Sequence, residues 1–422
     1  MGVSVNIALK KLVEYAYNEV DYYRELFDNN SIDIGSINTK DELSKLPFLT
    51  KEIVQKESLR MVANQYKRYP KNQLLEIRRT SGSTGEYLRV YWDLKTDLKS
   101  LIPLWRVRTR FYSIEPNMKS CSFHTVNYRK NKIINPESQE INFRDKHLSF
   151  YKIGLTYERL KKCYDMILSF NPDWLSLQPS IAYLLTQIVK EYNLPIPSNL
   201  KYIELNGELL TDGYRRAINE IFGIEPVNMY GMMETNTIAI EHDDKKLHVL
   251  EDNVIAEIIK DGRQVIGEEG EVHVTSLSNY AMPFIRYKTG DIGIIRYENS
   301  NEIIEISSGR SSDFIILENG EKLNNYILFG IIQYTNEYMH NAIKQFQITQ
   351  TDIGKFDVLL SLKDEYKNWE SAIKEKFIEN INEEALRKAS WNFHFTDNIL
   401  PDSQTGKTKY FRSLNNTAFH NA

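Results

Sequence analysis

The chain has 422 residues, more than one hydrophobic core usually supports, so two or more domains are expected. Hydrophobic residues make up 41% of the sequence and charged residues 26%, as in an ordinary folded protein. The formal net charge of -4 gives no general attraction to nucleic acid or to anionic membranes. The cysteines, Cys121 and Cys163, are too few for a disulfide framework or a cysteine zinc cluster and suit a reducing compartment.

The N-terminal residues contain no apolar signal core, and no stretch of the sequence reaches the length of a membrane span. We therefore expect a cytoplasmic protein with no nucleic-acid partner and no membrane partner. The sequence leaves the oligomeric state open, with a homodimer as one alternative.

Apolar residues at helical spacing predict a first helix over residues 7–27, ending near Asn29. A second short helix is expected after Thr39 and is stopped by Pro47. An apolar lead-in from residue 76 then reaches a cluster of small residues: Thr80, Ser81, Gly82, Ser83, Thr84 and Gly85.

This cluster suits a phosphate-binding loop, because glycines allow close backbone approach and consecutive N–H groups and hydroxyls supply donors. It is not a Walker loop, since Glu86 stands where that motif requires lysine. Taken alone, such a cluster of Ser, Thr and Gly is more often an ordinary turn, and the motifs that follow later in the chain favour the phosphate loop.

Between residues 156 and 221 the pattern alternates between helical spacing and short apolar strands. Helices are expected over 160–168, 181–189 and 211–221, with strands over 173–177 and 202–205. Such alternation predicts a parallel sheet covered by helices on both faces, with ligands beyond the carboxyl ends of the strands. Two loops are expected at that edge, residues 206–208 and 228–234.

Beyond residue 254 the apolar period shortens to two, which predicts an antiparallel layer with a hairpin turn at Asp261-Gly262. Its expected strands cover 254–259, 271–276, 291–296 and 302–306. A polar junction near Arg310 leads into a compact α+β tail with expected helices over 324–337 and 369–386 and expected strands over 343–349, 356–362 and 391–395.

The predicted fold class is therefore α/β. We expect a large N-terminal domain, residues 1–309, with doubly wound, mostly parallel sheets and a small β-rich layer. A small, mobile α+β C-terminal domain is expected over residues 310–422.

Polar residues in the expected loops suggest nucleotide chemistry. Gly207 would let a nucleobase approach the backbone, and Tyr230 offers an aromatic face. Glu234 could carry Mg²⁺, which prefers one or two carboxylates together with substrate oxygens and water. Asp291 could accept hydrogen bonds from a ribose diol, although an aspartate after Thr-Gly is by default a turn residue.

Two basic residues follow later in the chain. Arg310 could place a planar cation beside the nucleotide, and its alternative role is to cap the junction. Lys407 follows a flexible turn and could reach a developing negative charge, whereas a solvated basic tail is the simpler explanation.

The ordered motifs T-S-G-S-T-G, N-G-E, Y-G-M-M-E, I-R-Y-K-T-G-D, G-R-S-S-D and the late T-G-K resemble those of the adenylate-forming superfamily of acyl-CoA synthetases. The P-F-I-R-Y-K-T-G-D form and the N-P-D-W-L-S-L-Q-P-S stretch make the chain most similar to the phenylacetate-CoA ligase branch and its capsule-biosynthesis-type relatives. The resemblance covers roughly residues 40 to 410.

The resemblance implies an ATP-dependent ligase. A small-molecule carboxylic acid and ATP give an acyl-adenylate and pyrophosphate, and the acyl group then passes to coenzyme A. Transfer to an amine or to a carrier protein is the alternative within this class. A nucleotide-binding protein with weakened or lost catalysis is the alternative from another class.

The same resemblance implies roles for individual residues, with Mg²⁺ as the metal. Residues 80–85 would hold the ATP phosphates, Glu234 the metal, and His124 and Met232 the acid, although His124 is equally well explained as a core histidine. The remaining implied residues are Gly207, Glu208, Tyr230 and Gly231 along the adenine, Asp291 at the ribose, Arg310 at the hinge and Lys407 as the catalytic residue of the first step.

Three positions depart from the family pattern. Glu86 replaces the usual lysine after the phosphate loop, and Arg78, Arg79 or Arg89 would have to compensate for it. Met233 replaces the usual Thr or Ser, a role that Thr235 or Asn236 would have to assume, and Ser312 stands in place of the hinge acid.

Overall fold

The computed structural model describes residues 2–67, 75–79, 88–124, 139–142, 146–151, 157–208, 210, 212–308, 314–318, 320, 322–324, 326–340, 342–381, 383–397, 399, 410–412 and 414. Among these residues, no helix combines the length and the apolarity needed to cross a membrane. The chain divides into two compact units, the first comprising residues 1–118, 202–209 and 226–310, and the second comprising residues 119–201, 210–225 and 311–422.

The first unit begins with two helices instead of the single one expected over residues 7–27. Val20 separates α1 (Gly2–Glu19) from α2 (Asp21–Asn29) because its backbone is extended, with φ -123° and ψ 112°. Its β-branched side chain is fully buried, so packing accounts for the break. The short helix expected after Thr39 is a 3₁₀ helix, η2 (Lys40–Lys45), with Thr39 and Glu42 forming a capping box.

The other helices of the first unit are η1 (Ile34–Ser36), α3 (Lys51–Glu57), α4 (Asn64–Lys67), α5 (Leu94–Ser100) and α6 (Ile102–Tyr112). Its strands are β1 (Leu75–Arg79), β2 (Arg89–Asp93), β7 (Tyr202–Asn206), β8 (Val227–Met232), β9 (Asn236–Glu241), β10 (Leu247–Val249), β11 (Val254–Lys260), β12 (Arg263–Val265), β13 (Gly270–Ser276), β14 (Tyr287–Glu298) and β15 (Asn301–Ser308).

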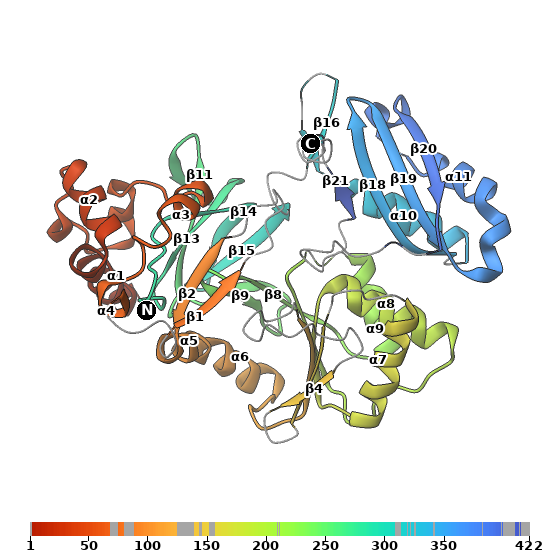
Figure 1. Ribbon diagram of the computed structural model, residues 1–422, viewed down its shortest axis with the longest axis horizontal. Coiled ribbons are helices and arrows are strands. Elements are labelled where there is room, and N and C mark those ends of the chain that lie inside the picture. The colour runs from red at the N-terminus through yellow and green to blue at the C-terminus, as the bar shows by residue number, and fades with distance from the viewer. Residues whose placement is uncertain are drawn as a thin grey trace. The chain divides into compact units, whose positions relative to one another are not determined.

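Strands of the first unit are ordered β12-β11-β13-β14-β15-β10-β9-β8-β7. The pair β7–β8 is parallel, whereas β8–β9 and the pairs from β9 to β12 are antiparallel. The predicted hairpin turn lies between β11 and β12, where both Asp261 and Gly262 have positive φ. Strands β1 and β2 form a separate antiparallel hairpin (Figure 1).

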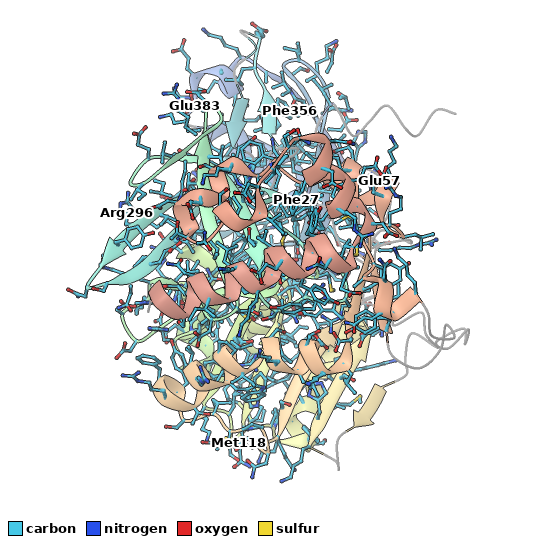
Figure 2. The ribbon with its side chains drawn as sticks, turned by 90° about the vertical axis from the view of Figure 1, so that its left-hand side faces the viewer. Phe27, Glu57, Met118, Arg296, Phe356 and Glu383 are labelled. Carbon is cyan, nitrogen blue, oxygen red and sulfur yellow. The ribbon has the colours of Figure 1, made fainter. Side chains whose placement is uncertain are left out.

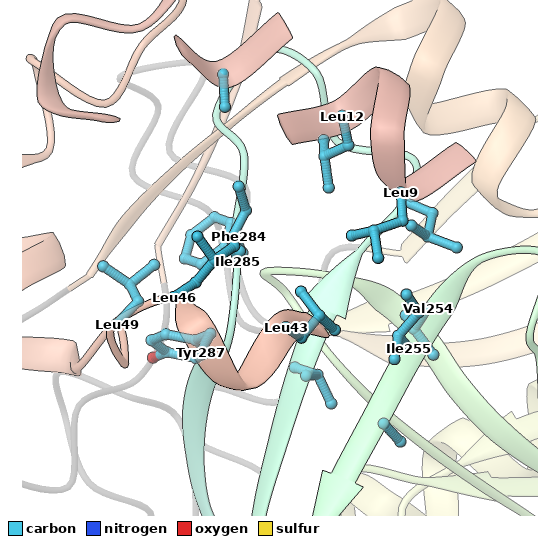
Figure 3. Packing of buried hydrophobic residues seen from close by; sticks show 14 of the residues in the cluster. Leu9, Leu12, Leu43, Leu46, Leu49, Val254, Ile255, Phe284, Ile285 and Tyr287 are labelled. Atoms are coloured by element: carbon cyan, nitrogen blue, oxygen red, sulfur yellow. The ribbon is translucent and has the colours of Figure 1, made fainter. Parts of the chain in front are cut away.

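Apolar side chains from the N-terminal helices pack against these strands. Leu9 and Leu12 of α1 and Leu43 of η2 are fully buried in one cluster with Val254 and Phe284 (Figure 3). Figure 2 shows the N-terminal helices lying across the strands of this unit. This packing fixes the strands and turns that carry the candidate site.

A buried ion pair anchors the I-R-Y-K-T-G-D segment. Arg286 Nη2 lies 2.9 Å from Glu257 Oε1, and Nη1 donates to the Leu46 carbonyl at 2.7 Å. The guanidinium also lies 4.4 Å from the ring centre of Phe48. Burial raises the pKa of Glu257, and the neighbouring Arg286 opposes that shift.

We expect Arg286→Met to lower the free energy of unfolding by about 3–5 kcal/mol, because it leaves the Glu257 carboxylate buried without its cation. Urea unfolding followed by tryptophan fluorescence measures this loss. Arg296→Met, on strand β14, which begins directly after Arg286, is the control, since its pair with Glu305 is exposed and such pairs contribute about 0–1 kcal/mol. Equal losses in the two variants would contradict the structural role of Arg286.

The second unit contains a sheet with the order β6-β3-β5-β4, in which β3 pairs in parallel with β5 and β6. Its elements are β3 (Ser120–His124), β4 (Gln139–Asn142), β5 (His147–Tyr151), β6 (Trp174–Leu177), α7 (Tyr157–Phe170), α8 (Pro179–Glu191) and α9 (Asp212–Phe222). Each expected helix and strand between residues 156 and 221 is present, with its ends within three residues of the expected ones.

The C-terminal segment contains the sheet β20-β19-β18-β21. Its elements are β16 (Phe314–Ile316), β17 (Lys322–Asn324), α10 (Tyr326–Tyr338), β18 (Ile343–Asp352), β19 (Lys355–Leu362), η4 (Asp364–Trp369), α11 (Glu370–Glu379), α12 (Glu384–Arg387), β20 (Ser390–Phe395) and β21 (Phe411–Arg412). The single helix expected over 369–386 is divided after Asn380, which caps α11.

The α/β fold class is confirmed, with parallel pairs in both units and helices between their strands. The domain boundary between residues 309 and 310 lies in the stretch 309–313, outside the described residues. The division into domains of residues 1–309 and 310–422 therefore stays a prediction.

Candidate active site

Two residues that the sequence singled out, Tyr230 and Asp291, meet in the first unit. Tyr230 lies on β8 and Asp291 on β14, and the Tyr230 hydroxyl donates to Asp291 Oδ2 at 2.6 Å. Four strand spacings of a flat sheet would separate these strands by about 19 Å, so the sheet curves to bring them together. Burial and the adjacent Asp291 carboxylate raise the pKa of Tyr230 well above its ordinary value, so Tyr230 stays a neutral donor.

The backbone before Asp291 is shaped by Thr289 and Gly290. The Asp291 N–H donates to Thr289 Oγ1 at 3.0 Å, and that hydroxyl donates to the Val272 carbonyl at 2.9 Å. Gly290 has φ +86°, a conformation that side-chain-bearing residues rarely adopt. Gly290 and Asp291 both lie inside strand β14, so the turn expected at this motif is not present.

Glu234 follows the end of β8 and is bound by a second tyrosine. Tyr287 donates through its hydroxyl to Glu234 Oε1 at 3.0 Å, and both side chains are buried. The Glu234 charge also contributes to the raised pKa of Tyr230, so the two tyrosine–carboxylate pairs are neighbours. Two carboxylates and two phenols thus gather at the carboxyl end of β8.

This arrangement fits Mg²⁺ only together with a ligand. Among the described residues, no group of three or more His, Cys, Asp or Glu is placed to hold a metal ion by itself. A single carboxylate such as Glu234 is nevertheless the kind of ligand that Mg²⁺ takes when substrate oxygens and water complete its coordination. The chemistry of the Glu234 carboxylate is therefore compatible with magnesium bound to a polyphosphate.

The structure corrects the expected loop at 228–234. Residues up to Met232 belong to strand β8, and only the turn from Met233 onward departs from it. Gly231 lies at an irregularity in the β8–β9 pairing, where a Cβ atom would come within 2.6 Å of the Asn236 carbonyl oxygen. Glycine is therefore required there for a packing reason, independently of any adenine contact.

Two side chains bind carbonyl groups of the turn that follows. The Trp92 indole N–H donates to the Met233 carbonyl at 2.9 Å. Asn253 donates to the carbonyls of Thr235 and Thr237 at 3.0 and 2.7 Å. These bonds satisfy backbone groups on both sides of Asn236, which has φ +59°.

Two suggested compensations for the family departures are not supported by this geometry. Arg78 and Asn236 bind each other, with Arg78 Nη1 donating to Asn236 Oδ1 at 2.8 Å, and Arg78 also pairs with Asp97. The side chain of Thr235 is fully buried. In this structure, Arg78 is therefore engaged with Asn236 and Asp97, and neither Thr235 nor Asn236 presents a donor in place of Met233.

Gly207 and Glu208 follow directly after β7. Gly207 has φ +80°, which ends the strand in a turn that favours glycine. Gly207 is exposed and Glu208 is partly exposed, so a ligand could reach the backbone there. Met232, the last residue of β8, is partly buried against the core that also contacts Tyr230.

The remaining predicted residues cannot be placed. Residues 80–85, Arg310 and Lys407 lie outside the described residues, as do Glu86 and Ser312. The backbone of His124 ends β3 in the second unit, and its side chain is outside the description. Their roles remain predictions.

Sequence reasoning missed Tyr287, Trp92, Asn253 and the partners of Arg78. Tyr287 had a usable signal, since it lies inside the I-R-Y-K-T-G-D motif. Trp92 and Asn253 had no such signal in the sequence. The contact of Trp92 with the turn spans 141 residues, and those of Asn253 span 16 to 18 residues.

Known proteins resemble this chain along most of its length, although no protein-family model matches it. A phenylacetate-coenzyme A ligase of Thermus thermophilus is 24% identical over 299 residues, 69% of this chain. Protein CapK of Staphylococcus aureus is 23% identical over 428 residues, covering 97% of this chain and 88% of CapK. A phenylacetate-coenzyme A ligase of Aromatoleum evansii is 25% identical and covers 73% of this chain and 70% of that ligase.

The chain is similar to acyl-CoA ligases of the adenylate-forming superfamily. The resemblance that its motifs predict, including that to the phenylacetate-CoA ligase branch, is confirmed. The alignment with the Thermus relative spans 64% of that relative's length.

Solved structures of CoA ligases share the fold of this chain. A 2-hydroxyisobutyryl-CoA ligase in its postadenylation state, in complex with R3-HIB-AMP, has a TM-score of 0.74 at 13% identity and covers 97% of this chain and 88% of that ligase. An anthranilate CoA ligase in complex with anthranoyl-AMP has a TM-score of 0.56 at 15% identity and covers 78% of this chain and 64% of that ligase.

Proposed function

We propose that this chain is an AMP-forming carboxylic acid–CoA ligase. It joins a carboxylic acid to ATP, releases pyrophosphate and transfers the acyl group from the acyl-adenylate to coenzyme A. The observation that carries the proposal is the convergence of Tyr230, Glu234 and Asp291 in one place at the carboxyl end of β8. Relatives named phenylacetate-coenzyme A ligase support the thiol acceptor.

In this proposal the described residues bind and orient the nucleotide. Asp291 accepts hydrogen bonds from the ribose diol while the Tyr230 hydroxyl fixes the orientation of its carboxylate. The Tyr230 ring lies along the adenine, and the turn at Gly207 allows that base to approach the backbone next to Glu208. These contacts hold ATP so that its α-phosphorus faces the acid carboxylate.

Glu234 is the proposed ligand of Mg²⁺, held by its bond from Tyr287. Bound magnesium would neutralise phosphate charge as the reaction proceeds. Residues 80–85 are proposed to hold the phosphates, Arg310 to act at the hinge near the ribose, and Lys407 to contact the acid carboxylate and α-phosphate. His124 and Met232 are the proposed acid contacts.

There are three alternatives to this proposal. Two concern the acceptor of the acyl group, and the third comes from the positions that depart from the family pattern. Transfer to an amine or to a carrier protein uses the same first step. A protein that binds nucleotide with weakened catalysis is motivated by Glu86, Met233 and Ser312, and the engaged side chain of Asn236 adds to it.

The experiment that tests the proposal measures pyrophosphate release with ATP, Mg²⁺ and a panel of aryl, fatty and amino acids, each with and without CoA. Release that depends on one acid class supports the ligase and identifies its substrate class. A rise in turnover with CoA supports the thiol acceptor. Nucleotide binding without release for any acid would favour the binding protein.

We expect Asp291→Ala to weaken ATP binding by about 10-fold or more, because the lost bonds to the ribose hydroxyls are charge-assisted. Isothermal titration calorimetry with ATP measures the dissociation constant. Tyr230→Phe keeps the ring and removes the hydroxyl, so its effect is expected to be smaller. An unchanged ATP affinity in Asp291→Ala would count against the ribose contact.

A further inference from the structure

Three polar side chains from separate elements form a closed ring beside the turn that carries Glu234. Arg78 of β1 donates to Asp97 Oδ2 at 2.6 Å and to Asn236 Oδ1 at 2.8 Å. The ring closes where Asn236 Nδ2 donates to Asp97 Oδ1 at 2.9 Å. Each member therefore binds the other two, and Asn236 Nδ2 also contacts Ser100 Oγ at 2.6 Å.

Both strands of the β1–β2 hairpin reach this turn. Arg78 on β1 holds Asn236, which lies two residues after Glu234, while Trp92 on β2 holds the Met233 carbonyl, one residue before it. The Arg78 guanidinium also lies 5.5 Å from the ring centre of Trp92. The β1–β2 hairpin therefore makes hydrogen bonds to the turn on both sides of Glu234.

The backbone conformation of Asn236 explains why these hydrogen bonds are needed. A non-glycine residue with φ +59° is disfavoured, and such a conformation persists only where the surroundings determine it. Asparagine tolerates it better than most residues, and here its amide oxygen and nitrogen are both bound within the ring. The ring therefore selects one conformation of the backbone next to Glu234.

The charges around Arg78 distinguish a positioning role from direct binding of a ligand. The Arg78 guanidinium carries one positive charge and pairs with two carboxylates, Asp97 at 2.6 Å and Glu76 at 3.5 Å. Because these two carboxylates more than cancel its charge, Arg78 adds little net attraction for a phosphate. A role through the turn accounts for its contacts better than a direct one.

We propose that Arg78 and Asn236 are positioning residues, which fix the Glu234 carboxylate in the orientation that holds the magnesium of Mg·ATP. The inference rests on the proposed function, because it assigns that metal to Glu234. Side chains that orient a metal-binding residue typically change metal affinity by about 10- to 100-fold when they are removed.

Calorimetric titration of the protein with ATP, with and without Mg²⁺, tests this inference through dissociation constants and needs no measurement of catalytic activity. The ratio of the two dissociation constants gives the enhancement of ATP affinity by Mg²⁺, and AMP serves as a ligand without the β- and γ-phosphates. We expect Asn236→Gly and Arg78→Met to reduce that enhancement about 10-fold and to leave the AMP dissociation constant within about twofold. Glu234→Gln should abolish the enhancement.

The variants are chosen to separate orientation from folding. Glycine adopts positive φ readily, so Asn236→Gly removes the amide without straining the turn. Arg78→Met/Asp97→Asn avoids leaving Asp97 buried and unpaired, and Arg78→Lys should restore part of the enhancement because it keeps the charge but not the planar fork. Arg106→Met is the control, since its side chain is 68% exposed in a surface pair with Asp252.

The outcomes distinguish the two proposals. If wild-type ATP binding shows no enhancement by Mg²⁺, the metal role of Glu234 fails, and the inference fails with it. If Glu234→Gln loses the enhancement while Arg78→Met and Asn236→Gly keep it, the inference is overturned and the proposed function stands. Equal weakening of ATP and AMP binding in the ring variants would mean a general structural role and would also overturn it.

Discussion

Replacing Glu234 with glutamine is expected to lower acid-dependent pyrophosphate release by about 10²- to 10³-fold. A bound divalent ion contributes several kcal/mol of transition-state stabilisation, and each 1.36 kcal/mol changes the rate about tenfold. Glutamine keeps the shape of the side chain and can still accept the hydrogen bond from Tyr287, so the loss reports the carboxylate charge. Initial rates at saturating ATP, measured across a range of Mg²⁺ concentrations, test this.

Glu298→Gln is the matched control, because Glu298 lies on the same strand as Asp291 and its partner Lys246 is at the surface. Its rate should equal that of the wild type. If Glu234→Gln kept more than about a third of the wild-type rate at every Mg²⁺ concentration, Glu234 would not be the metal ligand of the reaction.

Lys407→Ala is expected to reduce adenylation by about 10²-fold or more, which is typical of losing one preorganised charge contact in the transition state. Transfer to CoA from a supplied acyl-adenylate should survive, because the proposed contact of Lys407 belongs to the first step. The two half-reactions are measured separately, by pyrophosphate release and by acyl-CoA formation from the purified adenylate.

Lys409→Ala removes a lysine two residues further on and should leave both half-reactions unchanged. An equal loss in both steps for Lys407→Ala would refute a role confined to adenylation. A loss of adenylation in both variants would indicate a general contribution of this basic segment.

Local patterns in the sequence predicted the elements well where one period dominates. The alternation of helices and strands between residues 156 and 221 follows from helical spacing and short apolar runs, and it is present in the structure. Buried context overrode local pattern at Val20, which breaks the first helix. It also did so at residues 228–232, where polar and glycine residues that read as a loop continue strand β8.

The site was predictable as a set of motifs but not as a set of contacts. Motif order identified Tyr230, Glu234 and Asp291, yet the hydrogen bond between Tyr230 and Asp291 spans 61 residues and depends on curvature of the sheet. Arg78 and Asn236 are 158 residues apart, and neither position has a local pattern that indicates the other. Such partners emerge only once the strands are assembled.

The most direct test of the central claim is acid-dependent exchange between ATP and labelled pyrophosphate in the absence of CoA. Exchange requires that the chain form an acyl-adenylate reversibly, whichever acceptor follows. We predict exchange with Mg²⁺ and at least one class of carboxylic acid, and its loss in Glu234→Gln. ATP binding without exchange for any acid of the panel would contradict the ligase and leave a nucleotide-binding protein.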